Sequence, residues 1–170
     1  MATQGQLQRL EAAHGRDQEL HAALASSARF AVRFGRSEYG VFGFPDLPGV
    51  PRELLASDPR SDAFSILASK QVATGTRALL LTFDAKAGAS GPLEQFLRDA
   101  QAQVAQEPGT GAWFALRFDN GRYGILAVFA DNGDRFAHLS GPVLGDLAKN
   151  ALSLLDGVPV MDLLDVVARA

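Results

Sequence analysis

The chain has 170 residues, of which 47% are hydrophobic and 21% are charged, and its net charge is −3. This composition is typical of a globular domain with a core, and the small negative charge argues against nucleic acid as a partner. Because cysteine is absent, disulfides and thiolate metal sites are excluded. No apolar run reaches the roughly 20 residues that cross a bilayer, so we expect no membrane partner and a cytoplasmic location.

The first third of the chain predicts a helical segment followed by a β-hairpin. Residues 7–25 place leucines and alanines at roughly helical spacing, which predicts a helix or a pair of helices. Alternating, aromatic-rich segments at 28–35 and 38–44 predict the two strands of the hairpin. Prolines restrict the stretch 46–59 to a short helical piece that starts near Pro51.

The middle of the chain predicts two strands and a helix. A strand at 63–72 closes the first series of elements. The segment 77–86 has a nearly continuous apolar run, which is typical of a central strand buried on both faces. A helix is expected over residues 91–106, because Ser90 suits its N-cap with Glu94 near the capping-box position, and Pro108-Gly109 ends it.

The last third of the chain predicts a second hairpin, followed by one or two helices and a final strand. Strands at 112–119 and 122–130 flank an Asn120-Gly121 pair, which is a strong signal for a tight hairpin turn. One or two helices are expected over 133–155, and a final strand over 159–168.

Part of the sequence occurs twice. Residues 29–34 (RFAVRF) return as 113–118 (WFALRF), and Tyr39-Gly40 returns as Tyr123-Gly124, in both cases 84 positions later. A fixed offset over two neighbouring segments indicates a duplicated structural unit.

The duplication predicts two domains, residues 1–74 and 75–170. The second reads as a complete β-α-β-β-α-β unit, the order of a ferredoxin-like sheet. The first has no evident counterpart of strand 77–86, so we interpret it as a degenerate repeat that lacks its first strand.

The missing strand has a consequence for assembly. An unpaired strand edge invites another strand, so we expect a strand exchanged from the second copy or from another chain to fill the gap. The apolar faces of the two hairpins are expected to pack against each other within one chain. On these faces, Phe30, Val32 and Phe34 would oppose Phe114, Leu116 and Phe118.

Four short segments of the second copy resemble the antibiotic biosynthesis monooxygenase family of dimeric α/β-barrel proteins. They are residues 83–88 (FDAKAG), 107–110 (EPGT), 113–118 (WFALRF) and 137–142 (AHLSGP). The resemblance covers about residues 77–170. In the first copy, residues 54–59 (LLASDP) are a faded version of the last segment, without its histidine.

The resemblance implies an α+β fold in which ferredoxin-like units pair through antiparallel sheets with helices outside. This chain would then be a fused pseudo-dimer, and a homo-oligomer is expected. Some family members oxidise phenols, quinols or anthrones with dioxygen and without a cofactor, which is the activity we expect here. The alternative is a non-catalytic module that binds a small molecule or supports assembly, because one fold hosts many functions.

Heme degradation is not expected. The heme-degrading relatives carry an asparagine on the first strand, a tryptophan on the third and a histidine on the second helix. Here Leu81 and Phe129 stand near the first two positions, and the segment 144–155 contains no histidine.

His138 is the candidate catalytic base. It is the one histidine of the second copy, and a histidine can take a phenolic proton near neutral pH. The competing interpretation is that it anchors the helix beside the Ser140-Gly141-Pro142 break. His14 and His21 show no metal-ligand pattern, so no metal is expected.

Trp113, Arg117 and Tyr123 are the candidate substrate-binding residues. Trp113 and Arg117 share one face of their strand and could offer an aromatic floor and a cation for an oxyanion. Both Arg117 and Tyr123 recur in the first copy, as Arg33 and Tyr39. For Arg117 a structural ion pair is therefore an equally open interpretation, and for Tyr123 a packing role beside the hairpin is favoured over that of a proton donor.

Overall fold

Eight strands form a closed barrel in the computed structural model, which describes residues 4–28, 30–43 and 49–169. Around the barrel the order is β1-β3-β2-β8-β5-β7-β6-β4. The first copy supplies β1 (Gln4–Glu11), β2 (Phe30–Arg33), β3 (Glu38–Gly43) and β4 (Arg60–Gln71). The second supplies β5 (Arg77–Ala85), β6 (Thr110–Phe118), β7 (Tyr123–Phe129) and β8 (Leu155–Arg169).

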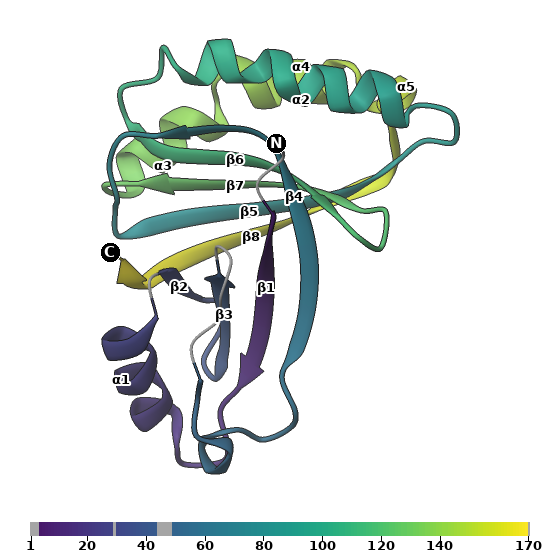
Figure 1. The fold of residues 1–170 in the computed structure, drawn as a ribbon. Helices are drawn as coiled ribbons and strands as arrows, with labels where there is room; N and C mark the ends of the chain where they lie inside the picture. Colours follow the sequence, from purple (N-terminus) through teal and green to yellow (C-terminus); the bar gives the residue numbers. More distant parts are fainter. Residues whose placement is uncertain (1–3, 29, 44–48, 170) are drawn as a thin grey trace.

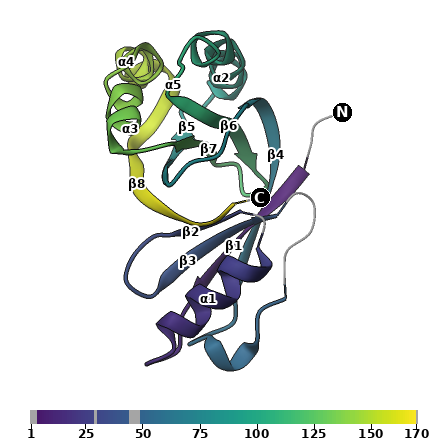
Figure 2. The same ribbon diagram turned by 90° about the vertical axis from the view of Figure 1, so that its left-hand side faces the viewer.

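The helices lie outside the barrel, as expected for this fold class. The first copy has α1 (Asp17–Ser27) and the 3₁₀ turn η1 (Arg52–Leu54). The second has α2 (Ser90–Val104), α3 (Asn132–Leu139), α4 (Pro142–Lys149) and α5 (Ala151–Leu154). Figure 1 shows the helices of the second copy covering the strands of that copy, with α1 at the opposite end of the molecule. Figure 2, at right angles, shows the strands of both copies between these two helical layers.

The first strand of copy one is present, so the prediction that this copy lacks it is wrong. Residues 4–11 form β1, which pairs antiparallel with β3 on one side and with β4 on the other. The helix expected from residue 7 begins only at Asp17. Glutamines and a glycine give β1 little intrinsic strand preference, so pairing on both edges decides its conformation. Gly5 is needed there, because a Cβ would lie 2.6 Å from the carbonyl oxygen of Gly43.

The other predicted elements are confirmed, with changes at their ends. The short helical piece near Pro51 is η1, and the helical stretch 133–155 divides into α3, α4 and α5. The final strand begins at Leu155, earlier than expected, because α5 is only one turn long. Positions 29 and 44 of the predicted first hairpin lie outside the described residues, as do 46–48 of the proline-containing stretch.

The two copies join edge to edge at two seams. At one seam β4 pairs with β6, from Phe64 opposite Phe118 to Gln71 opposite Ala112. At the other, the end of β8 pairs with β2. Since β1 fills its own place, no strand exchanged from copy two or from another chain is needed, and that expectation is wrong.

The barrel interior is an apolar core to which both copies contribute. Val32 is buried there together with Leu116 and Phe118, and Phe30, Phe34 and Phe114 pack against the same cluster. The expectation that these two faces meet within one chain is therefore confirmed.

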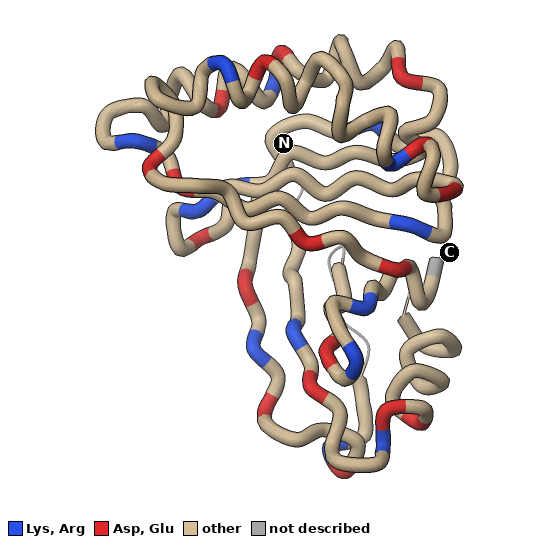
Figure 3. Tube along the Cα trace, turned by 180° about the vertical axis from the view of Figure 1, so that it is seen from behind, with Lys and Arg blue, Asp and Glu red and all other residues tan. Residues whose placement is uncertain are grey.

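Charged residues of both signs are interspersed along both copies, as Figure 3 shows from behind. This distribution accords with the small net charge of −3. Among the described helices, none combines the length and the apolar character that crossing a membrane requires.

Candidate functional site

The candidate site lies between the sheet of the second copy and its helices. The helix-facing side chains of this sheet pack with α2, α4 and α5 in a single apolar cluster. Trp113, Tyr123 and Phe129 supply its aromatic side chains from β6 and β7, and Phe83 supplies another from β5. The predicted site residues Trp113 and His138 are both buried in this layer.

His138 sits in the last turn of α3 and is held against the sheet. The helix starts cleanly because the Asp131 side chain accepts a hydrogen bond of 2.9 Å from the backbone N–H of Asp134. At the other end of α3, His138 is 2% exposed and its ring centroid lies 5.3 Å from that of Phe129. Packing on Phe129 therefore fixes the plane of the imidazole.

Glu107 pairs with His138 and sets its tautomer. The distance from His138 Nδ1 to Glu107 Oε2 is 2.6 Å, and the hydroxyl of Thr110 donates to the same oxygen over 2.7 Å. A carboxylate can only accept, so Nδ1 must carry a proton. In the neutral imidazole, Nε2 then presents a lone pair. It is the only ring nitrogen left to act as a base.

Three buried polar atoms of this layer have no hydrogen-bond partner among the described residues. They are Nε2 of His138, Oε1 of Glu107 and Nε1 of Trp113. Buried polar groups are nearly always satisfied in native proteins, so an orphaned set calls for an explanation. A base, a carboxylate oxygen and an indole donor are the groups that could bind a hydroxylated ligand.

Lys70 positions Glu107 from the first copy. Its ammonium donates to the carbonyl oxygens of Val104, at 3.1 Å, and of Glu107, at 2.6 Å. Val104 ends α2, so the cation also meets the negative end of the helix dipole. Lys70 belongs to β4 and stands opposite Trp113 in the β4–β6 register. The first copy thus contributes directly to the site of the second.

Arg117 and Tyr123 are engaged with a helix. The Tyr123 hydroxyl donates to Glu94 Oε2 over 2.8 Å, and Arg117 Nη1 lies 3.1 Å from Glu94 Oε1. Burial, followed by the hydrogen bond to Glu94, raises the pKa of Tyr123. Of the two interpretations left open for these residues, the contacts favour the structural one, in which they fasten α2 to the sheet.

The first copy repeats this arrangement. Tyr39 donates to Asp17 Oδ1 over 2.8 Å, and Arg33 Nη2 lies 2.8 Å from Asp17 Oδ2. Burial, then the hydrogen bond to Asp17, raises the pKa of Tyr39 to about 12. A pattern that recurs in the copy without the histidine dyad is best explained by helix attachment.

Four residues of the site were not assigned roles from the sequence. Glu107 and Thr110 stood in a segment that resembles the family, but nothing in that segment pointed to a histidine partner 31 positions away. Glu94 was placed only near the start of the predicted helix and Lys70 carried no signal, because each acts through a contact between distant strands and helices. Over residues 4–28, 30–43 and 49–169, no group of three or more potential ligand side chains could hold a metal ion.

Comparison with known proteins shows which solved structures share this fold. No protein-family profile matches the chain, and no curated protein sequence does either. A monooxygenase candidate from Fusobacterium nucleatum superposes with a TM-score of 0.81 at 12% identity, over 98% of this chain and 93% of its own. A ferredoxin-fold protein from Listeria monocytogenes, described as related to antibiotic biosynthesis monooxygenases, superposes with a TM-score of 0.65 at 12% identity, over 97% and 95%.

The chain has the ferredoxin fold of proteins related to antibiotic biosynthesis monooxygenases. A nearer relative in sequence is NE2512 of Nitrosomonas europaea, a protein of unknown function that is 37% identical. The match spans 53% of this chain and 87% of NE2512, with a TM-score of 0.52. The two chains belong to one family, and NE2512 has about the length of one copy of this monooxygenase-related fold.

Proposed function

We propose that this protein is a cofactor-independent monooxygenase that oxidises a small aromatic phenol, quinol or anthrone. The observation that carries the proposal is the Glu107–His138 dyad, whose free Nε2 lies buried in an aromatic layer of the second copy. The monooxygenase-related fold supports the class of reaction. The named substrates come from the family resemblance.

His138 would begin the reaction as a general base. Its Nε2 accepts the phenolic or enolic proton of the substrate, and Glu107 stabilises the imidazolium through the proton on Nδ1. The substrate anion is then electron-rich enough to reduce dioxygen. For an anthrone, one oxygen atom becomes the new carbonyl, and the other leaves as water with the two hydrogens of the oxidised methylene. Dioxygen is the oxidant and the substrate itself supplies all the electrons, so the reaction needs no further reductant.

Trp113 would orient the substrate. Its indole N–H is a buried donor without a partner in the described structure, so it can bond a substrate oxygen. Arg117 and Tyr123 would act indirectly, by holding α2 and the wall of the site through Glu94.

The substrate must pass the short helices. His138 is nearly inaccessible, and α3 and α4 meet above it at Ser140-Gly141. Both helices are only eight residues long, so we propose that this segment opens to admit the substrate.

The first test is oxygen uptake on a panel of anthrones and hydroxynaphthoquinols, with and without a metal chelator. We expect turnover above the uncatalysed rate that the chelator leaves unchanged. Chelator-sensitive turnover would contradict the cofactor-free mechanism. Ligand binding without turnover on any member of the panel would support the alternative of a binding module. The full burial of His138 and Trp113 favours a further outcome, in which neither ligand nor turnover is found and His138 only anchors α3 through Glu107.

The second test is His138→Ala. Removal of a general base should lower kcat by roughly 10² to 10⁴. The variant also leaves Glu107 without its partner, so a stability loss of about 1–3 kcal/mol is expected as well. His14→Ala, which removes an exposed histidine of the first copy, is the matched control and should change neither quantity.

Glu107→Gln separates catalysis from anchoring. The amide keeps the size of the side chain and can still accept from Nδ1, but it no longer offers a negative charge to the imidazolium. We expect kcat to fall with little change in Tm. Full activity in both His138→Ala and Glu107→Gln would refute the role of the dyad.

A further inference from the structure

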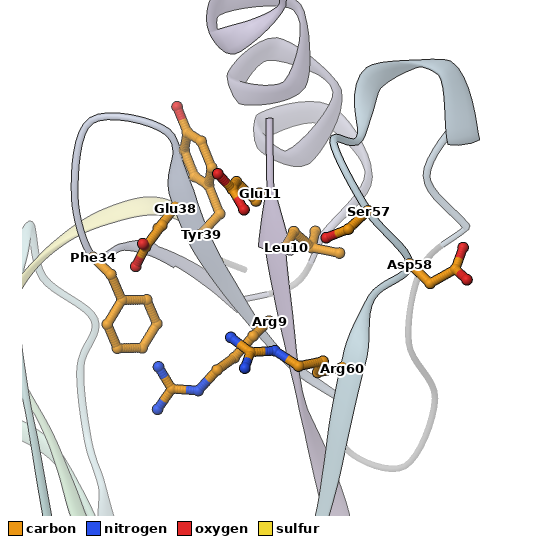
Figure 4. Close-up of a pocket in the computed structure, with 9 residues that line it drawn as sticks. All are labelled: Arg9, Leu10, Glu11, Phe34, Glu38, Tyr39, Ser57, Asp58 and Arg60. Carbon is orange, nitrogen blue, oxygen red and sulfur yellow. The ribbon is translucent and has the colours of Figure 1, made fainter. Parts of the chain in front are cut away.

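A surface groove in the first copy has no role in the proposed reaction. It has a volume of about 350 Å³ and lies at the end of the sheet formed by β4, β1 and β3, whereas His138 is on α3 of the second copy. Figure 4 shows the side chains around it. They are Arg9, Leu10, Glu11, Phe34, Glu38, Tyr39, Ser57, Asp58 and Arg60.

Two arginines lie side by side at this groove, on neighbouring strands. Arg9 on β1 is the direct antiparallel partner of Arg60 on β4. Like charges directly opposite each other on neighbouring strands are destabilising. Within the described part of the chain, neither guanidinium has a hydrogen bond or an ion pair. Figure 4 shows both side chains extending toward Phe34.

The position of Arg9 is fixed by an aromatic ring. Its guanidinium carbon lies 4.5 Å from the centroid of Phe34, which is the geometry of a cation–π contact. Phe34 can lie there because Gly40 has no side chain, since a Cβ would come within 2.6 Å of the ring. Stacking occupies one face of the guanidinium and leaves its N–H edges available for an anion.

Two carboxylates form a second like-charge pair at the groove, this one negative. Glu11 on β1 is the direct partner of Glu38 on β3, and neither forms an ion pair with any described residue. Other polar groups at the groove are engaged: Asp58 with Arg52 at 3.0 Å, and Tyr39 with Asp17. Besides Asp58, which Arg52 balances, the groove therefore holds two positive and two negative charges that are arranged as like-charge pairs.

We propose that this groove binds a small zwitterion, with its anionic group on Arg9 and Arg60 and its ammonium group toward Glu11 and Glu38. An anion alone would relieve the repulsion between the arginines but would meet the carboxylates, and a cation alone would do the reverse. A ligand with both charges relieves both pairs. Arginine forks suit a carboxylate or a phosphate as the anionic end.

The experiment compares three probes of one chain length on the intact protein: γ-aminobutyrate, butyrate and butylamine. Thermal unfolding is followed at constant low ionic strength, because screening weakens exposed charges. We expect γ-aminobutyrate to raise Tm in a saturable way, and the two singly charged probes to have much smaller effects. A 3-aminopropylphosphonate arm shows whether the anionic end is better served by a phosphonate than by a carboxylate.

Three variants assign the effect to the groove. Arg9→Gln, Arg60→Gln and Glu38→Gln should each require roughly tenfold more γ-aminobutyrate for half of the Tm shift, the loss expected for one charge-assisted contact. Arg36→Gln is the control, because Arg36 carries the same charge on the neighbouring hairpin turn but does not line the groove. Equal responses to all three probes, or groove variants that respond like Arg36→Gln, would overturn the proposal.

Discussion

Each copy has one carboxylate that binds both a tyrosine and an arginine of the adjacent sheet. It is Asp17 in the first copy and Glu94 in the second. Asp17 is the first residue of α1 and Glu94 lies early in α2, so each carboxylate fastens the start of a helix. The Arg117 side chain is 46% exposed, whereas that of Glu94 is 14% exposed. Exposed ion pairs contribute little on their own, so the buried tyrosine hydrogen bond carries most of the attachment.

The tyrosines make stability depend on alkaline pH. Their pKa values are raised in the folded protein, to about 12 for Tyr39, against 10.0 for a free tyrosine. Between these values the folded state keeps a proton that the unfolded state has lost. The contribution of these tyrosines to the free energy of unfolding is therefore fully present below pH 10. It declines as the pH rises toward the folded pKa, by up to about 1.4 kcal/mol per pH unit for one tyrosine.

The measurement is urea unfolding between pH 8 and 12. Tyr39→Phe should cost about 1 kcal/mol at pH 8, and this difference from the natural chain should shrink above pH 10. The chain has only two tyrosines, so the double variant with Tyr123→Phe is a control free of tyrosine titration. A constant difference over the whole range would show that the hydrogen bonds do not govern the titration.

The sequence repeat pointed to the arginine and the tyrosine of this arrangement, but not to the carboxylate that joins them. Arg33 and Tyr39 recur at an offset of 84, which flagged a shared role. Their carboxylate partners are 77 positions apart and differ in type, so the repeat could not reveal them. Likewise His138 could be singled out as the one histidine of its copy, whereas Glu107 could not, because its function depends on a turn packing against α3.

At the scale of elements, the connection between β4 and β5 is tightly packed against the second copy. The backbone N–H groups of Val72 and Ala73 both donate to the carbonyl oxygen of Gly111, at 2.9 and 3.0 Å. Gly75 lies against the end of β7, where a Cβ would be 1.9 Å from the carbonyl oxygen of Phe129. The segment that joins the copies is thus a fitted part of the structure.

Gly75→Ala should destabilise the protein strongly. The new methyl group would collide with backbone, which cannot rotate away, so we expect a loss of at least about 2 kcal/mol in the free energy of unfolding. Gly35→Ala is the control, because a Cβ there meets nothing within 4 Å. Chemical denaturation of both variants gives the comparison, and equal stability would mean that the connection is loosely held.

Elements with strong local patterns were predictable, and β1 was not. The apolar run of β5 and the Asn-Gly turn between β6 and β7 are local signals, and both elements occur as predicted. In β1, Leu7 faces the barrel and Leu10 faces α1, a spacing of three that resembles a helix. Only its two neighbouring strands make it a strand, and no local pattern encodes them.

At the scale of the whole molecule, duplication predicted a pseudo-dimer, but closure of the barrel depends on two seams. The seams differ in length: β4 pairs with β6 from Phe64 to Gln71, while β2 pairs with β8 only over Phe30 to Arg33. Strand register at a seam is set by side chains from both copies, which a sequence pattern in one copy cannot specify.

Separate expression of the copies tests how far each depends on the other. Alone, residues 1–74 would expose the barrel-facing phenylalanines and leave the seam edges of β2 and β4 unpaired, so we expect an unfolded or aggregating fragment. Residues 75–170 should instead form a homodimer with two equivalent seams, since the related NE2512 has about the length of one copy. Analytical ultracentrifugation and thermal melts measure both outcomes, and mixing the fragments should recover a soluble 1:1 complex. A cooperatively melting 1–74 fragment would show instead that the first copy is an independent domain, and that the barrel interior shared by Val32 and Leu116 is dispensable for its folding.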